Sequence, residues 1–414
     1  MDALRSFFGL LVLILIAWAF STDRRRICWR TVAWGTGLQL VFALLILKTQ
    51  PGEAFFDFCG RAVNRLLAFQ YEGAQFVFNA LAIPPGQPGS TGFYFAFQVL
   101  TTIIFFSSLI SVLYYLGVMQ KLVLGFAWIM ARTCGTSGAE SLSASANIFV
   151  GQTEAPLLIK PYVGSMTRSE LLCVMTGGMA TVAGGVLAAY VGMLRAAYPD
   201  IAGHLLAASV MSAPAALVMA KLLLPETETP KTMGVVELPY KDPSANVIEA
   251  AANGATTGLQ LALNVGAMLV AFMSLLAMLN WGVGQVAGLV GHPDVRFETL
   301  LGWLFAPLAW LMGTPSSDCL AVGRLMGEKT VLNEFVAYSH LAALPEPLAR
   351  RSYVIVTYAL CGFSNFLSIG IQIGGIGALA PERRSDLARL GWRALLGGSL
   401  ACFMTAAVAG LLVR

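Results

Sequence analysis

The most informative stretch of the chain is residues 146–156, ANIFVGQTEAP, which places an amide, a hydroxyl and a carboxylate side by side in apolar surroundings. These three groups belong to Gln152, Thr153 and Glu154. A polar side chain held at hydrocarbon depth loses its hydration, and that cost is recovered only when the side chain binds something polar. We therefore expect this stretch to bind a polar solute within a membrane.

Composition identifies a polytopic membrane protein. Of the 414 residues, 57% are hydrophobic and only 12% are charged, which is more apolar than a soluble domain needs to fill one core. The net charge of +4 is spread over loops without a basic block, so we expect no nucleic acid as a partner. The seven cysteines never form a C-x-x-C pair, which predicts neither a disulfide framework nor a zinc site.

Eight segments are long and apolar enough to span the hydrocarbon layer of about 30 Å. They lie near residues 4–22, 30–48, 94–120, 170–195, 202–224, 254–280, 352–377 and 394–413. The first is followed at once by Arg24, Arg25 and Arg26, which indicates an uncleaved helix with the N-terminus on the outer side. The loops that this topology places inside hold most of the Lys and Arg residues, as expected for a multi-pass protein.

Two further stretches, residues 138–166 and 298–342, are apolar but repeatedly interrupted by small and polar residues. Such stretches are poor straight spans and are typical of re-entrant hairpins, in which irregular backbone is buried in protein or lines a wet cavity. The alternative interpretation is a pair of ordinary helices that Gly and Ser help to pack. We expect two re-entrant helical hairpins in addition to the eight transmembrane helices.

The two halves of the chain repeat one pattern. Glu154 is followed by a span with GGMATVAGG at 177–185, and Glu334 is followed at a similar interval by CGFSNFLS at 361–368. Each half is thus an interrupted hairpin, a buried glutamate and a span with small and polar residues in its middle. Counting spans gives the halves opposite orientations, and transporters with such inverted repeats place their substrate site where the halves meet.

Three motifs together resemble those of the concentrative nucleoside transporter family in its bacterial form: GQTEAP at 151–156, NEFVAY at 333–338 and CGFSN at 361–365. The likeness extends from Phe7 to the end of the sequence. It implies a homotrimer in the bacterial inner membrane that imports nucleosides by symport with a cation. It also implies a scaffold domain, residues 1–120 and 250–283, and a mobile transport domain, residues 121–249 and 284–414, each half of which carries one hairpin.

The resemblance implies base contacts from the first motif and ribose contacts from the others. Gln152 and Thr153 would pair with the base edge, and Glu154 would accept from a base nitrogen directly or through water. Glu334 and Asn365 would bind the ribose, since a carboxylate accepting from two hydroxyls suits a sugar. The remaining contacts would come from Ser368 beside the ribose and from an apolar wall of Phe363, Val186 and Leu261. The duller alternatives are a structural pair of glutamates and, for the phenylalanine, ordinary core.

The resemblance also implies a sodium site. The side-chain oxygens of Asn147 and Thr181, with the carbonyls of Val150 and Val182, would hold the ion, and an all-oxygen set of neutral groups suits a hard monovalent cation. Alternatively, the hydroxyl of Thr181 bonds back to its own helix and Asn147 caps the hairpin helix.

Sodium-coupled nucleoside symport by elevator-type alternating access is therefore the predicted function. A proton-coupled nucleoside or nucleobase transporter is the alternative, because Glu154 and Glu334 both qualify as proton carriers. A channel would need rings of one residue type, and an enzyme would need a nucleophile with a base or metal ligands, none of which is readable. At the expected tip of the second hairpin, Thr314–Asp318 departs from the family pattern, so no role is transferred there. We expect Asp318 to cap the helix that follows.

Overall fold

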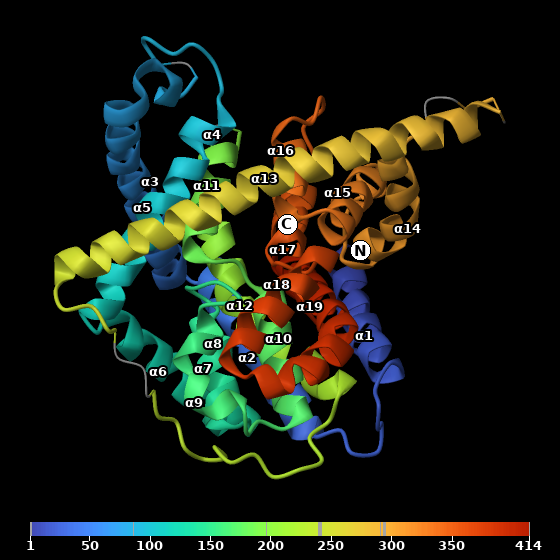
Figure 1. The fold of residues 1–414 in the computed structure, drawn as a ribbon. Coiled ribbons are helices and arrows are strands. Elements are labelled where there is room, and N and C mark those ends of the chain that lie inside the picture. The colour runs from blue at the N-terminus through green and yellow to red at the C-terminus, as the bar shows by residue number, and fades with distance from the viewer. Residues whose placement is uncertain are drawn as a thin grey trace.

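The computed structural model describes residues 2–85, 87–195, 197–238, 242–289, 291–292 and 295–413, and every regular element in these ranges is helical. Figure 1 shows the arrangement. The first part of the chain forms α1 (Asp2–Ala19), α2 (Trp29–Lys48), α3 (Gln50–Phe78), η1 (Asn79–Ala82), α4 (Phe95–Gln98) and α5 (Leu100–Tyr115). The apolar runs predicted as the first three spans correspond to α1, α2 and α4–α5.

Helix α3 was not predicted, because its apolar residues are separated by charged and polar ones and it therefore lacks the continuous apolar run of a span. Its start is nonetheless well defined by local chemistry. Pro51 lies in the first turn, and the hydroxyl of Thr49 accepts a hydrogen bond from the Gly52 N–H at 3.1 Å. A proline and a hydroxyl cap at these positions both favour helix initiation.

The rest of the chain contains the same order of elements twice. The first series is α6 (Val118–Cys134), α7 (Gly138–Ala146), α8 (Ala155–Leu158), α9 (Lys160–Val163), α10 (Arg168–Ala180), α11 (Gly184–Leu194) and α12 (Ile201–Leu223). The second is α14 (Phe297–Leu311), α15 (Cys319–Val331), α16 (Glu334–Ala342), α17 (Arg350–Leu360), α18 (Phe366–Leu379), η2 (Pro381–Arg383) and α19 (Arg384–Leu412). We call residues 138–163 the first helix pair and residues 319–342 the second helix pair.

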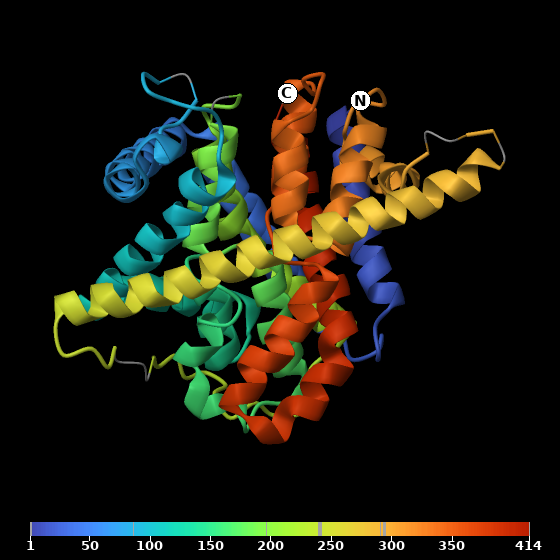
Figure 2. The ribbon, with the colours of Figure 1, turned by 45° about the horizontal axis from the view of Figure 1, so that its top comes forward.

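Between the two series runs α13 (Val247–Gly288), which crosses one face of the whole molecule, as Figure 1 and Figure 2 show in yellow. It packs along α5 through two glycines four residues apart. A Cβ atom on Gly254 would lie 2.6 Å from the Ser111 side chain, and one on Gly258 would lie 2.8 Å from the Ile104 backbone. Small residues at this spacing allow helix backbones to approach closely within a membrane.

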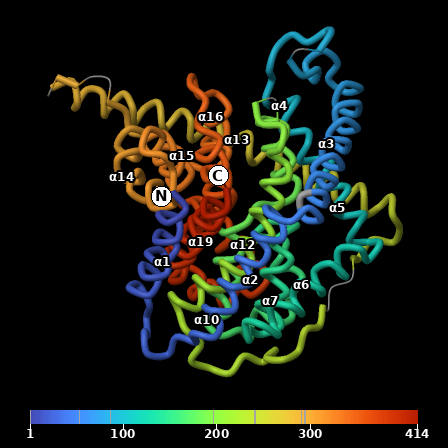
Figure 3. Tube along the Cα trace, turned by 180° about the vertical axis from the view of Figure 1, so that it is seen from behind, coloured from blue at the N-terminus to red at the C-terminus, as the bar shows by residue number. Residues whose placement is uncertain are grey.

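The core of the molecule is built from α10, α12, α17 and α19, which pack against one another. Helices α1 and α2 pack on this core from the side opposite α13, where α1 contacts α19 and α2 contacts α12, as the view from behind in Figure 3 shows. By contrast, α13 exposes large apolar side chains along most of its length, including Leu263, Val270 and Trp281. An apolar surface of this extent is suited to lipid or to another protein chain.

Seven helical segments in the described ranges are long and apolar enough to cross a membrane, when α10 and α11 are counted as one. Each of these seven segments corresponds to one predicted span. Where a predicted span is longer than the helical segment, it extends at most five residues beyond an end, as for the predicted 94–120 and the observed Phe95–Tyr115. The predicted span at 352–377 is instead divided into α17 and α18 by an irregular segment at 361–365. The predicted span at 170–195 is interrupted in the same way, between α10 and α11.

The placement of Thr314–Asp318 at the tip of the second hairpin was wrong. This segment joins α14 to α15, whereas the turn of the second helix pair is Leu332–Asn333. Asp318 does precede α15, but its carboxylate makes no capping hydrogen bond to that helix and accepts instead from the Ala349 N–H at 3.1 Å. The error arose because both turns interrupt the same apolar stretch, and the sequence alone does not distinguish the inner turn from the outer one.

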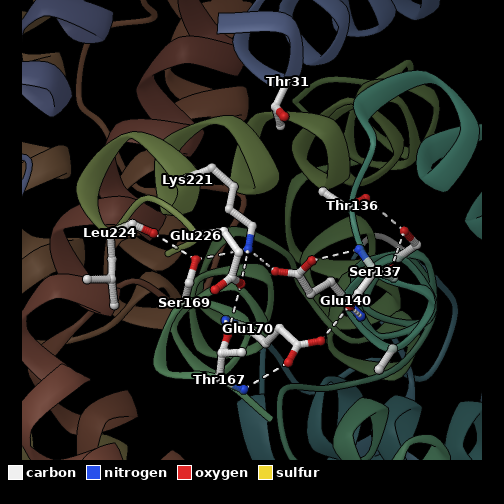
Figure 4. Close-up of polar contacts among 12 residues, drawn as sticks. Thr31, Thr136, Ser137, Glu140, Thr167, Ser169, Glu170, Lys221, Leu224 and Glu226 are labelled. Carbon is white, nitrogen blue, oxygen red and sulfur yellow. Dashed lines mark hydrogen bonds and ion pairs between the residues drawn. The ribbon is translucent and has the colours of Figure 1, made fainter. Parts of the chain in front are cut away.

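A buried ionic cluster fixes the base of the first helix pair to the core, and Figure 4 shows its members. Glu140 and Glu170 are each the third residue of a helix and accept hydrogen bonds from the backbone N–H groups of Ser137 and Thr167. The ammonium of Lys221, at the end of α12, forms an ion pair with Glu140 and donates to the Ser169 hydroxyl at 2.9 Å and to Glu226 at 3.3 Å. The start of α7, the start of α10 and the end of α12 are thereby held together.

We expect Lys221→Met to destabilise the protein by about 3–5 kcal/mol, because removing one member of a buried ion pair leaves the other charge uncompensated. The measurement is thermal unfolding of the purified protein in detergent, followed by size-exclusion chromatography. Lys231→Met removes an equivalent but exposed ammonium from the linker that follows and is expected to unfold like the wild type. Equal melting temperatures for the two variants would contradict this account of the cluster.

Candidate functional site

The two interrupted helices meet where their helical geometry is broken. The first break is Thr181–Ala183 and the second is 361–365. The Phe363 N–H donates to the Thr181 carbonyl at 3.2 Å, which joins the two breaks directly. The Gly184 N–H donates to the Phe149 carbonyl at 2.9 Å, which joins the first break to the turn of the first helix pair. Irregular backbone from both series is therefore concentrated in one place in the interior.

A cavity of about 260 Å³ lies beside these breaks, between them, α13 and the turns of both helix pairs. All nine residues predicted to contact the substrate line it: Gln152, Thr153, Glu154, Val186, Leu261, Glu334, Phe363, Asn365 and Ser368. No residue of 312–318 lines it, in keeping with the corrected position of that turn. The structure thus brings the predicted residues together, while their contacts to a substrate stay a prediction.

Glu334 is held in a fixed orientation at one end of the cavity. Its side chain is buried, with 3% of the residue exposed, and its two oxygens accept from the Tyr190 hydroxyl at 3.1 Å and from the Asn365 amide at 3.0 Å. The Asn365 carbonyl oxygen in turn accepts from the Ser368 N–H at 2.9 Å and caps α18. A carboxylate with one donor on each oxygen retains lone pairs for the hydroxyls of a ligand.

The amide of Gln152 connects the first helix pair to α18. It donates to the Ser368 hydroxyl at 3.1 Å and accepts from the Gln372 amide at 3.0 Å, and Gln372 also donates to the Met175 carbonyl at 2.9 Å. The carboxylate of Glu154, partly buried in the same turn, accepts from the Gly151 N–H. Gln152 and Glu154 are thus fixed by protein contacts and still line the cavity.

Four polar or flexible residues at this site were not predicted from the sequence. Tyr190 and Gln372 belong to no motif and act only through their partners Glu334 and Gln152, so nothing in their local sequence marks them. Asn264 and Met268 line the cavity from α13, where they follow Leu261 at helical spacing. That spacing was the one signal that could have found them, since residues three or four positions apart share a helix face.

Two of the predicted ion ligands, Thr181 and Val182, directly follow α10, and Asn147 lies against the last turn of that helix. Val150 lies three residues after Asn147, in the turn of the first helix pair. Asn147 is completely buried; its amide nitrogen donates to the Ser143 carbonyl at 3.0 Å, and its oxygen has no partner within the described ranges. The Thr181 hydroxyl donates to the Gly177 carbonyl at 2.9 Å. Both contacts named as alternatives to ion binding are therefore present: Asn147 caps α7 and Thr181 bonds back to its own helix. In each residue, however, the side-chain oxygen keeps a lone pair that could bind an ion. A buried, unpartnered amide oxygen is costly unless it binds a cation or a donor, so this donor set fits sodium.

A second cavity, also of about 260 Å³, adjoins the first and shares Glu154, Ala183 and Leu261 with it. It lies between α5, α13 and the first helix pair and extends to Asp242 and Ser244, just before the start of α13. Hydroxyl groups of α5 and α13, such as those of Ser107 and Thr257, line it. Glu154 therefore lines both cavities, one on the side of Glu334 and the other on the side of Asp242 and Ser244.

Three protein-family models match the chain. The model described as Na+ dependent nucleoside transporter C-terminus matches residues 204–410, and its N-terminal counterpart matches residues 8–81. A model described as nucleoside recognition matches residues 96–197. The three matches therefore cover both series of helices and the helices that precede them.

Individual relatives and solved structures agree with these matches. An uncharacterised transporter of Haemophilus influenzae is 45% identical over all of this chain and 98% of its own length. Mouse solute carrier family 28 member 3 is 43% identical, and the chain spans 58% of that protein's length. The structure of CNTnw in an inward-facing substrate-bound state matches with a TM-score of 0.91, and a substituted CNTnw in an outward-facing state with 0.93, both at 45% identity. These two matches cover all of this chain and 98% and 99% of the solved chains.

Proposed function

The chain belongs to the Na+ dependent nucleoside transporter family, and we propose from this premise that it is a secondary active transporter that imports nucleosides by symport with sodium. The observation that carries the proposal is the buried cavity lined by all nine predicted substrate residues. Such a cavity, with two carboxylates and few competing cations, suits a neutral solute rich in hydrogen-bond donors. Membership in a family of transporters also agrees with the prediction that the protein is not an enzyme.

In the proposed complex, the ribose hydroxyls donate to Glu334, whose orientation is already set by Tyr190 and Asn365. The base lies toward the first helix pair, where Gln152, Thr153 and Glu154 offer donors and acceptors to its edge. Phe363, Val186 and Leu261 form the apolar wall against its faces. This arrangement gives each polar atom of the ligand a partner, as a buried polar ligand requires.

Sodium binds, in the proposed mechanism, between Asn147 and Thr181, with the Val150 and Val182 carbonyls completing the set. The ion would order the turn of the first helix pair, because Asn147 and Val150 belong to that turn and Thr181 does not. Gln152 and Glu154 lie only a few residues further along the same turn. Ordering by one ligand lowers the entropic cost of binding the next, which couples the nucleoside to the ion.

Transport proceeds, in our proposal, by an elevator-type movement of the transport domain against the scaffold domain of a homotrimer in the bacterial inner membrane. The apolar face of α13 supports a role in contacts with lipid and other protomers. The relatives of known structure occur in inward-facing and outward-facing states, which supports alternating access. In this proposal the scaffold keeps its predicted bounds, residues 1–120 and 250–283, and it contacts the transport domain where α1 packs on α19 and α2 packs on α12.

Uptake of labelled uridine into proteoliposomes tests the proposed function. A tenfold inward sodium gradient stores about 1.4 kcal/mol per ion, which supports about tenfold accumulation of uridine when one ion moves with each nucleoside. We expect accumulation above the external concentration with this gradient and only equilibration without it.

Three results would contradict the proposal. Accumulation driven by a proton gradient but not by sodium would favour a proton-coupled carrier. Uptake of uracil without uridine would favour a nucleobase carrier. Uridine flux that equilibrates and never accumulates under either gradient would favour a channel.

A further inference from the structure

Lys329, on α15, is one of the largest side chains in the protein with almost no exposed surface. Its ammonium donates to the Ala359 carbonyl at 2.8 Å and lies 5.9 Å from the centre of the Phe403 ring. In the described ranges no carboxylate is within ion-pair distance of it, and its neighbour Glu328 pairs with Arg324 and His340 instead. A buried lysine without a carboxylate partner is rare and costly, which calls for a role.

The ammonium of Lys329 lies at the C-terminal end of α17, and this position indicates its role. Ala359 is the second-last residue of α17, the half-helix that ends at the second break. The last carbonyls of a helix have no partner within the helix and carry its negative partial charge, so a cation is favourable there. Tyr338, on the other helix of the second helix pair, donates to the Thr357 carbonyl of the same turn at 2.8 Å. Both helices of that pair are therefore bonded to the end of α17.

The first series has the same arrangement with one difference. Helix α10 ends at Ala180, and its last turn faces Asn147 of the first helix pair. No Lys or Arg side chain from the first helix pair reaches that end among the described hydrogen bonds; the side chain there is the amide of Asn147, whose oxygen has no partner in the described ranges. The proposed sodium would occupy the position that the ammonium of Lys329 occupies in the second series.

We propose that the ammonium of Lys329 is the permanent counterpart, in the second repeat, of the transported sodium ion in the first. The inference rests on the proposed sodium site. One repeat then takes its cation from solution and the other holds a cation covalently, so the protein moves one sodium ion per nucleoside. The attached cation also holds the turn Leu332–Asn333 and offsets the charge of Glu334, which follows that turn.

Two substitutions separate the charge of Lys329 from its hydrogen bond. Lys329→Met removes both at similar volume, and Lys329→Gln removes the charge but keeps an N–H donor for the Ala359 carbonyl. We expect both variants to bind and take up uridine at least about tenfold more weakly at saturating sodium, since both lose the buried positive charge at the end of α17, next to the second break. The increase in melting temperature on adding sodium chloride in place of choline chloride should persist in both, because the first-repeat site is intact.

Lys160→Met, which removes an exposed ammonium from α9, serves as the matched control and should behave as the wild type. Uridine uptake by Lys329→Gln equal to that of Lys160→Met would overturn the inference and leave the proposed function standing. A wild type that shows no sodium-driven uridine uptake would overturn both. If neither Lys329 variant folds, the ratio of sodium to uridine in the wild type, measured from the potential at which flux reverses, decides: one ion supports the inference and two ions overturn it.

Discussion

Glu334→Gln is expected to lower uridine uptake by at least about 100-fold, because it removes two charge-assisted hydrogen bonds to ribose that contribute about 1.5–3 kcal/mol each. The substitution also disturbs hydrogen bonds within the protein. Tyr190 and Asn365 both donate to the carboxylate, so an amide would turn its N–H toward one of these donors. Uracil, which lacks the ribose, should bind to the variant about as well as to the wild type. Initial rates of uptake and equilibrium binding of both compounds measure the effect.

The matched control is Glu346→Gln, which makes the same chemical change at an exposed position in the segment between α16 and α17. We expect this variant to take up uridine like the wild type. Uptake by Glu334→Gln at more than half of the wild-type rate would contradict the assignment of Glu334 to ribose. Parallel losses of uridine and uracil binding would instead indicate that the glutamate only maintains the shape of the cavity.

Asn147→Ala is expected to raise the sodium concentration that gives half-maximal uridine uptake by at least about tenfold. The substitution removes the buried oxygen that has no protein partner in the described ranges, and the loss of one ion ligand costs on the order of 1.4 kcal/mol or more. At very high sodium the variant should recover most of its transport rate, because the contacts to the nucleoside are unchanged. The measurement is a sodium titration of uptake into proteoliposomes.

Ser145→Ala provides the control for Asn147→Ala. Its hydroxyl, buried in the same helix, donates to the Ser141 carbonyl at 2.7 Å and has no place in the proposed ion site. A sodium titration of Ser145→Ala should therefore overlay that of the wild type. An unchanged sodium requirement in Asn147→Ala would show that Asn147 is not an ion ligand. Its role would then be limited to capping the end of α7 through its hydrogen bond to the Ser143 carbonyl.

Much of the site was predictable because its residues are chemically out of place. Gln152, Glu154 and Glu334 are polar groups in apolar segments, and the cost of burying such groups makes them conspicuous in the sequence itself. In each case the signal is local, so a single sequence carries it. The breaks at 181–183 and 361–365 were not predicted, although small and polar residues were noted in the middle of both predicted spans.

What could not be predicted depends on contacts between distant segments. Gln372 is an ordinary residue of an apolar helix until its contact with Gln152, 220 positions away, is seen. Nothing in the sequence around Lys329 distinguishes it from an exposed lysine near the end of a helix, and only the packing against α17 shows that it is buried. The misplaced turn at Thr314–Asp318 has the same cause, since the distance of a turn from the cavity is a property of the folded chain.

The central claim is that one nucleoside binds between the two halves of the protein, with its ribose on Glu334 and its base on the first helix pair. The most direct test is a structure determined by electron cryo-microscopy with uridine and sodium bound. The account predicts both ribose hydroxyls within about 3 Å of the carboxylate or amide oxygens of Glu334 and Asn365, and the uracil edge at the same distance from Gln152 or Thr153. Uridine bound outside this cavity, or inside it with the ribose turned away from Glu334, would contradict the account.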